Sequence, residues 1–165
     1  MLEITIMIIV DTCSWLKIQL IYDKLKVDLR NMFQEFEILS THQLNDELKY
    51  YLKEFIDSTI FQIHPINQDD MDQFKTLGFD LADASIIILS KEKKAFVITE
   101  DGELLVFLIN SNIKAIQLAE FFLALLNLDK IEKRECYNLI KFLREQKNIK
   151  ENKHKKLKAK LQELR

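Results

Sequence analysis

The chain has 165 residues and a formal net charge of −2, with 48% hydrophobic and 30% charged residues. This composition is typical of a single globular domain and excludes an intrinsically disordered chain. The sequence holds only 2 glycines and 1 proline, which excludes the Gly-rich loops that bind nucleotide phosphates. No apolar run approaches the roughly 20 residues of a membrane helix, and the N-terminal segment lacks the features of a signal peptide. The two cysteines form no CxxC pair and suggest no disulfide framework, so we expect a cytoplasmic protein. Because a long apolar run is lacking, we also expect no association with membranes.

The predicted elements alternate between strands and helices. In chain order they are a strand at 4–10, a helix at 14–33, a strand at 36–39, a helix entered through the S-x-x-Q capping sequence at 40–43, a strand at 59–66, helices at 69–77 and 80–92, a strand at 95–98, a helix at 103–109, a strand at 112–116, and helices at 118–128 and 130–146. This alternation predicts an α/β fold, a three-layer α/β/α sandwich with a parallel five-stranded sheet.

The charge is distributed unevenly along the chain. Residues 1–129 hold 11 Lys and Arg against 21 Asp and Glu, whereas residues 130–165 hold 13 against 5. We therefore expect one domain at 1–128 and a basic, helical C-terminal extension at 129–165. Such an extension is typical either of a nucleic-acid-binding arm or of a helix that docks on a partner, since its apolar residues are also spaced for a partner helix.

Acidic residues follow two of the predicted strands directly. Asp11 comes after the first strand, and the sequence Thr99-Glu100-Asp101 comes after the fourth. Because ligands of an open parallel sheet bind beyond the carboxyl ends of its strands, these residues are candidate site residues.

Two further carboxylates lie on helices but beside apolar positions. Glu47 borders the inner stripe of its helix, and Asp83 is surrounded by Leu81, Ala82, Ala84 and Ile86. An ionised carboxylate in such a setting is costly unless it is paired or binds a metal ion. Carboxylate oxygens select hard cations, so the sequence predicts a site for Mg²⁺ or Mn²⁺, which suits phosphodiester hydrolysis.

Four segments in this order resemble the PIN-domain family. They are Ile-Val-Asp11-Thr-Cys-Ser-Trp, Gln43-Leu-Asn-Asp-Glu47-Leu, Leu81-Ala-Asp83-Ala-Ser-Ile and Val97-Ile-Thr-Glu-Asp101-Gly-Glu-Leu. The resemblance covers roughly residues 4–126. It implies the three-layer fold and metal-dependent cleavage of RNA, with Asp11, Glu47, Asp83 and Asp101 as the catalytic and metal-binding residues. Thr12, Ser14 and Thr99 then match supporting hydroxyl positions, and Glu100 is a further ligand or an ordinary neighbour.

The family also includes toxins of type II toxin–antitoxin pairs, so an antitoxin or another protein is an expected partner beside the RNA substrate. By analogy with other PIN-like chains we expect a homodimer. The extension after residue 128 is longer than a minimal PIN toxin needs, which leaves the toxin and RNA-processing roles both open.

Other interpretations of the same residues remain. Asp11 terminates a strand, Asp83 follows the potential helix cap Asp80, and Asp101 is suited to cap the helix at 103. A non-catalytic PIN-fold module that binds RNA or protein is the main alternative function. A receiver-type signalling domain also clusters acids at a sheet edge, but the third strand here ends at His64-Pro65 rather than at an aspartate.

Overall fold

The computed structural model describes residues 5–52, 54–146 and 149–164. Its contacts divide the chain into two compact units, Met1–Ile116 and Gln117–Arg165. The division comes before the boundary expected after residue 128, because the helix at Leu118–Asn127 packs with the two helices that follow it. We describe each unit by itself.

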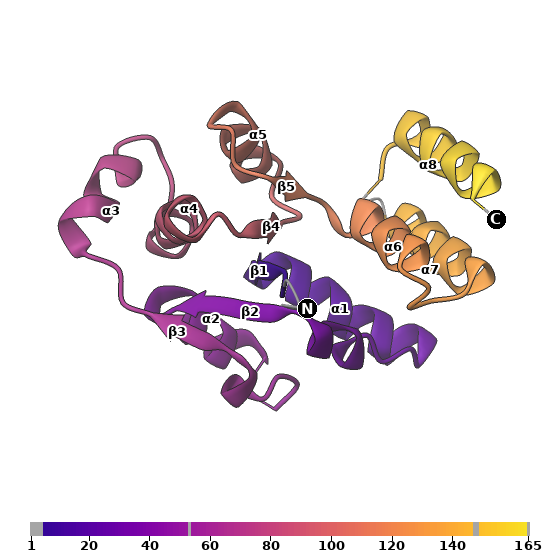
Figure 1. The fold of residues 1–165 in the computed structure, drawn as a ribbon, viewed down its shortest axis with the longest axis horizontal. Coiled ribbons are helices and arrows are strands. Elements are labelled where there is room, and N and C mark those ends of the chain that lie inside the picture. The colour runs from indigo at the N-terminus through magenta and orange to yellow at the C-terminus, as the bar shows by residue number, and fades with distance from the viewer. Residues whose placement is uncertain (1–4, 53, 147–148, 165) are drawn as a thin grey trace. The chain divides into compact units, whose positions relative to one another are not determined.

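The first unit is built on a parallel five-stranded sheet with the strand order β3-β2-β1-β4-β5 (Figure 1). The strands are β1 (Met7–Val10), β2 (Glu37–Thr41), β3 (Gln62–His64), β4 (Phe96–Ile98) and β5 (Ala115–Ile116). Helices flank the sheet in a three-layer α/β/α arrangement, so the predicted fold class is confirmed. The expected first strand began at Ile4, which lies outside the described residues.

Five α-helices connect these strands. They are α1 (Thr12–Leu25), α2 (His42–Leu52), α3 (Gln68–Lys75), α4 (Leu81–Lys93) and α5 (Gly102–Asn110), with short 3₁₀ helices η1 (Arg30–Glu35) and η2 (Ser58–Ile60). Helix α4 packs across β1, β2 and β4, and Figure 1 shows α1 on the other side of these strands.

The single helix predicted at 14–33 is wrong in its second half. Helix α1 ends at Leu25. The next residue, Lys26, adopts the left-handed conformation with φ 57° and donates its backbone N–H to the carbonyl oxygen of Tyr22. Leu29 and Phe33 are nevertheless buried, because the 3₁₀ helix η1 carries the apolar spacing onward. The apolar spacing therefore continues from α1 into η1, and the break between the two helices cannot be recognised from that spacing.

The central strands are buried as the sequence predicts. Ile9 in β1 and Val97 in β4 have no exposed surface, and Trp15 and Ile86 from two flanking helices are equally buried. Burial of this kind stabilises the fold by about 1.5–3 kcal/mol for each large apolar side chain. The core thereby holds the carboxyl ends of β1 and β4 in a rigid relation.

In the described residues of the second unit, 117–146 and 149–164, there are three helices, α6 (Leu118–Asn127), α7 (Lys133–Glu145) and α8 (Glu151–Glu163). Phe122 of α6 and Leu139 of α7 are fully buried, and α8 contributes Leu157 and Leu161 to the same interior. The extension is therefore a folded helical unit rather than a simple tail. In the part of the chain that the structure describes, no helix combines the length and apolar character needed to cross a membrane.

Candidate functional site

Asp11 lies at the junction of β1 and α1 and caps the helix. Its Oδ1 accepts the backbone N–H of Ser14 at 2.8 Å, and its backbone N–H donates to the carbonyl oxygen of Ile98 at 3.1 Å. Only 4% of Asp11 is exposed, and this burial raises the pKa of its carboxyl group, although bonds from Ser14 and Thr99 oppose the shift. The sequence suggested only that Asp11 ends a strand, whereas the structure shows that it also caps α1.

Thr99 connects the ends of β4 and β1. The pairing of Val10 with Ile98 sets Asp11 and Thr99 side by side as the next residues of adjacent strands. The buried Thr99 hydroxyl donates to Oδ2 of Asp11 and accepts the backbone N–H of Asp101 at 3.0 Å. Thr99 thus contacts two of the predicted site residues, Asp11 and Asp101.

Asp101 begins α5. Its Oδ1 accepts the backbone N–H groups of Glu103 at 2.8 Å and Leu104 at 3.0 Å. The carboxylate is partly buried, and its charge raises the pKa of Asp11. Glu100 precedes Asp101 and is likewise partly buried. The predicted cap and the predicted site position are therefore the same residue.

Glu47 extends from α2 toward the end of β1. Its Oε2 accepts a hydrogen bond from the hydroxyl of Thr12 at 2.6 Å. Partial burial raises the pKa of Glu47, as do the charges of Asp80 and Asp11, while the Thr12 bond lowers it. Thr12 and Glu47 are 35 residues apart in sequence, so this contact between two predicted site residues depends on the fold.

Asp83 lies in the first turn of α4, which Asp80 caps through a bond from the Asp83 backbone N–H at 2.8 Å. The pKa of the Asp83 carboxyl group is raised from 3.8 to about 7, first by burial and then by the charges of Asp80, Asp101, Asp11 and Glu47, in that order. Asp80 was recognised from sequence only as a possible cap. The structure adds it to the acidic group, beside Glu47.

The charges of all four predicted carboxylates raise the pKa of one group, the thiol of Cys13. The pKa of this thiol is raised to about 11, first by burial and then by the charges of Asp11, Asp101, Asp83 and Glu47. Cys13 lies in the first turn of α1 and is exposed at the surface. The high pKa keeps the thiol protonated at neutral pH, so it lacks the thiolate that a nucleophilic cysteine requires.

Two buried hydroxyl groups connect the end of β2 with α4. Thr41 Oγ1 lies 2.6 Å from Ser85 Oγ, and both residues have no exposed surface. Thr41 also accepts the backbone N–H of Leu44 at 3.0 Å. The helix cap is therefore Thr41, whereas the sequence motif assigned it to Ser40, which lies within β2. Ser14 is also buried, and its hydroxyl donates to the carbonyl oxygen of Ile98 at 3.3 Å.

An open groove of about 550 Å³ lies beside Glu47. It lies between α2 and α4, and Lys75 of α3 contributes the one cation to its lining. Within residues 5–52, 54–146 and 149–164, no three His, Cys, Asp or Glu side chains are close enough together to hold a metal ion as they stand. The acids share an edge of the sheet and influence one another electrostatically, but they remain separated.

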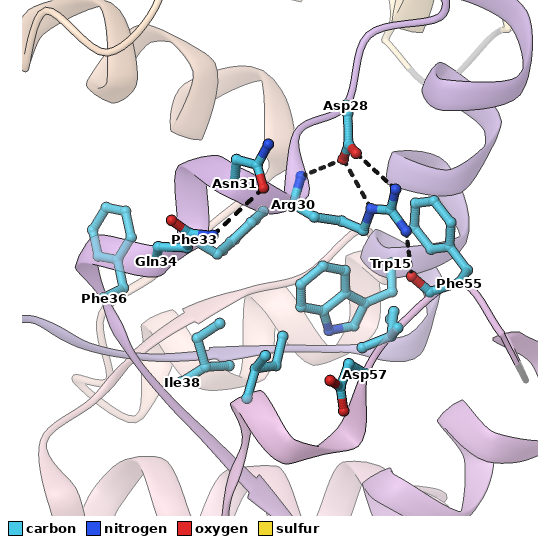
Figure 2. A pocket seen from close by; sticks show the side chains of 12 residues that line it. Trp15, Asp28, Arg30, Asn31, Phe33, Gln34, Phe36, Ile38, Phe55 and Asp57 are labelled. Atoms are coloured by element: carbon cyan, nitrogen blue, oxygen red, sulfur yellow. Dashed lines mark hydrogen bonds and ion pairs between the residues drawn. The ribbon is translucent and has the colours of Figure 1, made fainter.

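A second hollow, of about 490 Å³, lies among residues that precede β2 and β3, away from the carboxyl ends of the strands (Figure 2). Arg30 lies at its wall, where it donates to Asp28 at 2.9 Å and 2.7 Å and to the carbonyl oxygen of Phe55 at 2.8 Å. The guanidinium also lies over the rings of Tyr22 and Phe55. These contacts are structural. None of the four predicted carboxylates, Asp11, Glu47, Asp83 and Asp101, lines this hollow.

Comparison with known proteins identifies no family for this chain. A scan against protein-family models found no match, and neither did a search of curated proteins. Among solved structures, the chain is similar to PAE2754 from Pyrobaculum aerophilum, with a TM-score of 0.48 and 16% sequence identity. That match covers 75% of this chain and 99% of the other. A likeness at this level carries no argument about activity.

Proposed function

We propose that this chain is a PIN-like endoribonuclease that hydrolyses RNA phosphodiester bonds with the help of Mg²⁺ or Mn²⁺. The observation that carries the proposal is the placement of Asp11, Glu47, Asp83 and Asp101. They come from four different segments and lie at one edge of the sheet, where Thr12 binds Glu47, Thr99 binds Asp11, and the charges of the other three acids help to raise the pKa of Asp83. Carboxylates that repel one another in this way are expensive for folding, and perturbed pKa values of this kind cluster at functional sites.

The donor set fits a hard divalent cation. All four side chains offer oxygen ligands, and three of them have pKa values raised by burial, which a bound cation would reverse by favouring the charged forms. A divalent ion in such a site polarises the phosphoryl oxygen and lowers the pKa of water.

The chain's own residues would divide the work as follows. Thr99 and the Ser14 backbone hold the Asp11 carboxylate in one orientation. Thr12 holds Glu47 near the same edge. The pKa of Asp83 is raised to about 7 in the protein without metal, so a bound cation would favour its ionised form and make it a ligand.

The proposal is tested by incubating the purified chain with a mixture of structured RNAs in Mn²⁺, Mg²⁺ or EDTA. We expect metal-dependent cleavage that is lost in Asp11→Asn/Asp101→Asn, because asparagine retains the helix caps but removes both charges. Asp69→Asn/Asp70→Asn is the matched control, since these two exposed carboxylates also lie in the first turn of a helix. Equal loss in both variants, or activity in EDTA, would contradict the assignment.

A non-catalytic PIN-fold module remains the second candidate, and the separation of the acids in the described residues favours it. Calorimetric titration with Mn²⁺ distinguishes the two. The nuclease requires metal binding that Asp11→Asn/Asp101→Asn abolishes, whereas the module requires none. A toxin role would add a protein antitoxin as partner, and a small gene directly upstream would support that role. We also propose that the chain assembles as a homodimer.

A further inference from the structure

We propose that the outward lysines of α8 form a binding surface for the phosphate backbone of RNA. This inference rests on the proposed nuclease function for the identity of its partner, but it concerns only the second unit. The surface consists of Lys155, Lys156, Lys158 and Lys160, which we call the α8 lysine face. All four residues are exposed.

The two units carry opposite charge. Residues 1–116 contain 11 Lys and Arg against 19 Asp and Glu, a net of −8, whereas residues 117–165 contain 13 against 7, a net of +6. A polyanionic substrate is repelled by a body of charge −8 that also gathers its carboxylates at the active edge. The basic unit supplies the attraction that the first unit lacks.

Cations of both α7 and α8 are already engaged within the unit, Lys155 among them at 3.8 Å from Glu151, which leaves Lys156 and Lys160. Lys133 donates to the carbonyl oxygen of Leu164 at 2.6 Å, Lys141 lies 3.8 Å from Glu145, and Arg144 lies 3.7 Å from Glu151. By contrast, neither Lys156 nor Lys160 has a carboxylate within ion-pair distance among the described residues. These two lysines are four residues apart, so they lie on the same side of the helix, one turn from each other.

The apolar side of α8 is already used. His154, Leu157 and Leu161 are buried within the unit, and Lys153 ties the helix to α6 through Glu120 at 2.8 Å and through Gln117. The apolar spacing that suggested a partner helix is therefore satisfied inside the chain. The same burial argues against a lipid surface, because an amphipathic helix binds lipid by inserting its apolar face. What α8 presents outward is charge on long side chains, which suits the sequence-independent contacts of a phosphate backbone.

The test measures binding of a labelled single-stranded RNA of about 30 nucleotides to the full chain from about 50 to about 300 mM salt. Asp11→Asn serves as the background that prevents cleavage. In this background we expect Lys156→Gln/Lys160→Gln to weaken binding about tenfold at the lowest salt and to reduce the log–log salt slope by about 1.4, since each single-strand phosphate contact contributes about 0.7.

The matched control is Lys91→Gln/Lys93→Gln, which removes two exposed lysines from the first unit with the same change of net charge. Equal effects of the two variants on the salt slope would overturn the proposal, because they would reflect net charge alone. Binding of anionic phospholipid vesicles or of poly-glutamate with the same dependence on Lys156 and Lys160 would overturn the assignment to RNA. Circular dichroism of both variants checks that the helices are retained.

The outcome is separable from that of the proposed nuclease. If the wild-type chain cuts RNA with Mn²⁺ but the α8 variant binds RNA normally, the nuclease stands and the α8 lysine face does not. If no metal restores cleavage and the α8 variant nonetheless loses salt-dependent RNA binding, the second unit is an RNA-binding element of a non-catalytic protein.

Discussion

The Thr99 hydroxyl donates a hydrogen bond to Oδ2 of Asp11 and accepts one from the backbone N–H of Asp101. One buried side chain therefore binds the carboxylate of Asp11 and the backbone of Asp101, although 88 residues separate Thr99 from Asp11. The parallel pairing of β1 with β4 makes this possible, because it sets the two strand ends in adjacent positions.

Thr99→Val should weaken both the fold and the site. The change leaves the buried Asp11 carboxylate without one donor, so we expect the free energy of unfolding to fall by about 1–3 kcal/mol. The pKa of Asp11 should rise further, because the Thr99 bond lowers it, and the pH dependence of RNA cleavage should shift to higher pH. Urea unfolding and a pH–rate profile measure the two effects. Thr99→Ser keeps the hydroxyl and should restore the profile; a Ser variant as impaired as Val would point to packing instead.

Asp83 should make the metal-free protein less stable as pH rises. Its pKa is raised from 3.8 to about 7, so the folded state holds a proton that the unfolded state has released between these values. By linkage, stability falls as pH rises from about 4 to about 7 and stays low above it. Because Asp83 is partly exposed, solvent screening limits the effect, and Asp83→Asn should raise the free energy of unfolding at pH 8 by about 1 kcal/mol, or a few degrees in Tm.

Metal ions should reverse that penalty in the wild type. Thermal unfolding at pH 8 with Mn²⁺ should show a Tm increase in the wild type and a much smaller one in Asp83→Asn. At pH 7, binding of Mn²⁺ should also release protons, since ligand carboxylates must be ionised. Calorimetry in buffers of different ionisation enthalpy measures this release. Identical Tm increases in the two proteins would mean that Asp83 is not near the bound ion.

Thr12 should matter through Glu47. Its hydroxyl donates to Glu47 Oε2 at 2.6 Å, so Thr12→Val removes the bond that holds this carboxylate near Asp11. We expect RNA cleavage to fall by about tenfold, roughly 1.4 kcal/mol, with a weaker dependence on Mn²⁺ concentration, whereas Thr12→Ser should remain close to the wild type. Glu47→Gln should abolish cleavage. Full activity of Glu47→Gln would remove Glu47 from the catalytic set.

The pair Thr41 and Ser85 should contribute to stability rather than to chemistry. Both hydroxyls are buried and lie 2.6 Å apart, and Ser85 also donates to the carbonyl oxygen of Ala82 at 2.7 Å. We expect Ser85→Ala to lower the free energy of unfolding by about 1–2 kcal/mol while metal affinity is unchanged. Urea unfolding and Mn²⁺ calorimetry test this together. A variant of normal stability with weakened metal binding would assign Ser85 to the site itself.

The sequence by itself determined the class of fold and where strands and helices alternate. The buried run Ile8–Val10 and the apolar faces of the helices follow from the spacing of apolar residues along the sequence. This spacing is local, so a single sequence is enough to recognise it. It also determined which carboxylates follow strands, because the edge of a parallel sheet is a property of strand direction. Asp11 and Asp101 were found on that basis.

The tertiary structure alone decided how these residues meet. The bonds between Thr12 and Glu47, between Thr99 and Asp11, and between Thr41 and Ser85 join segments 35 to 88 residues apart, and no local pattern encodes such distances. The helix break at Lys26 and the burial of α8 on its own unit were likewise invisible, because left-handed turns and helix docking depend on contacts made elsewhere. The sequence pattern identifies the candidate acids, and the fold determines which of them lie near enough to affect one another's charge.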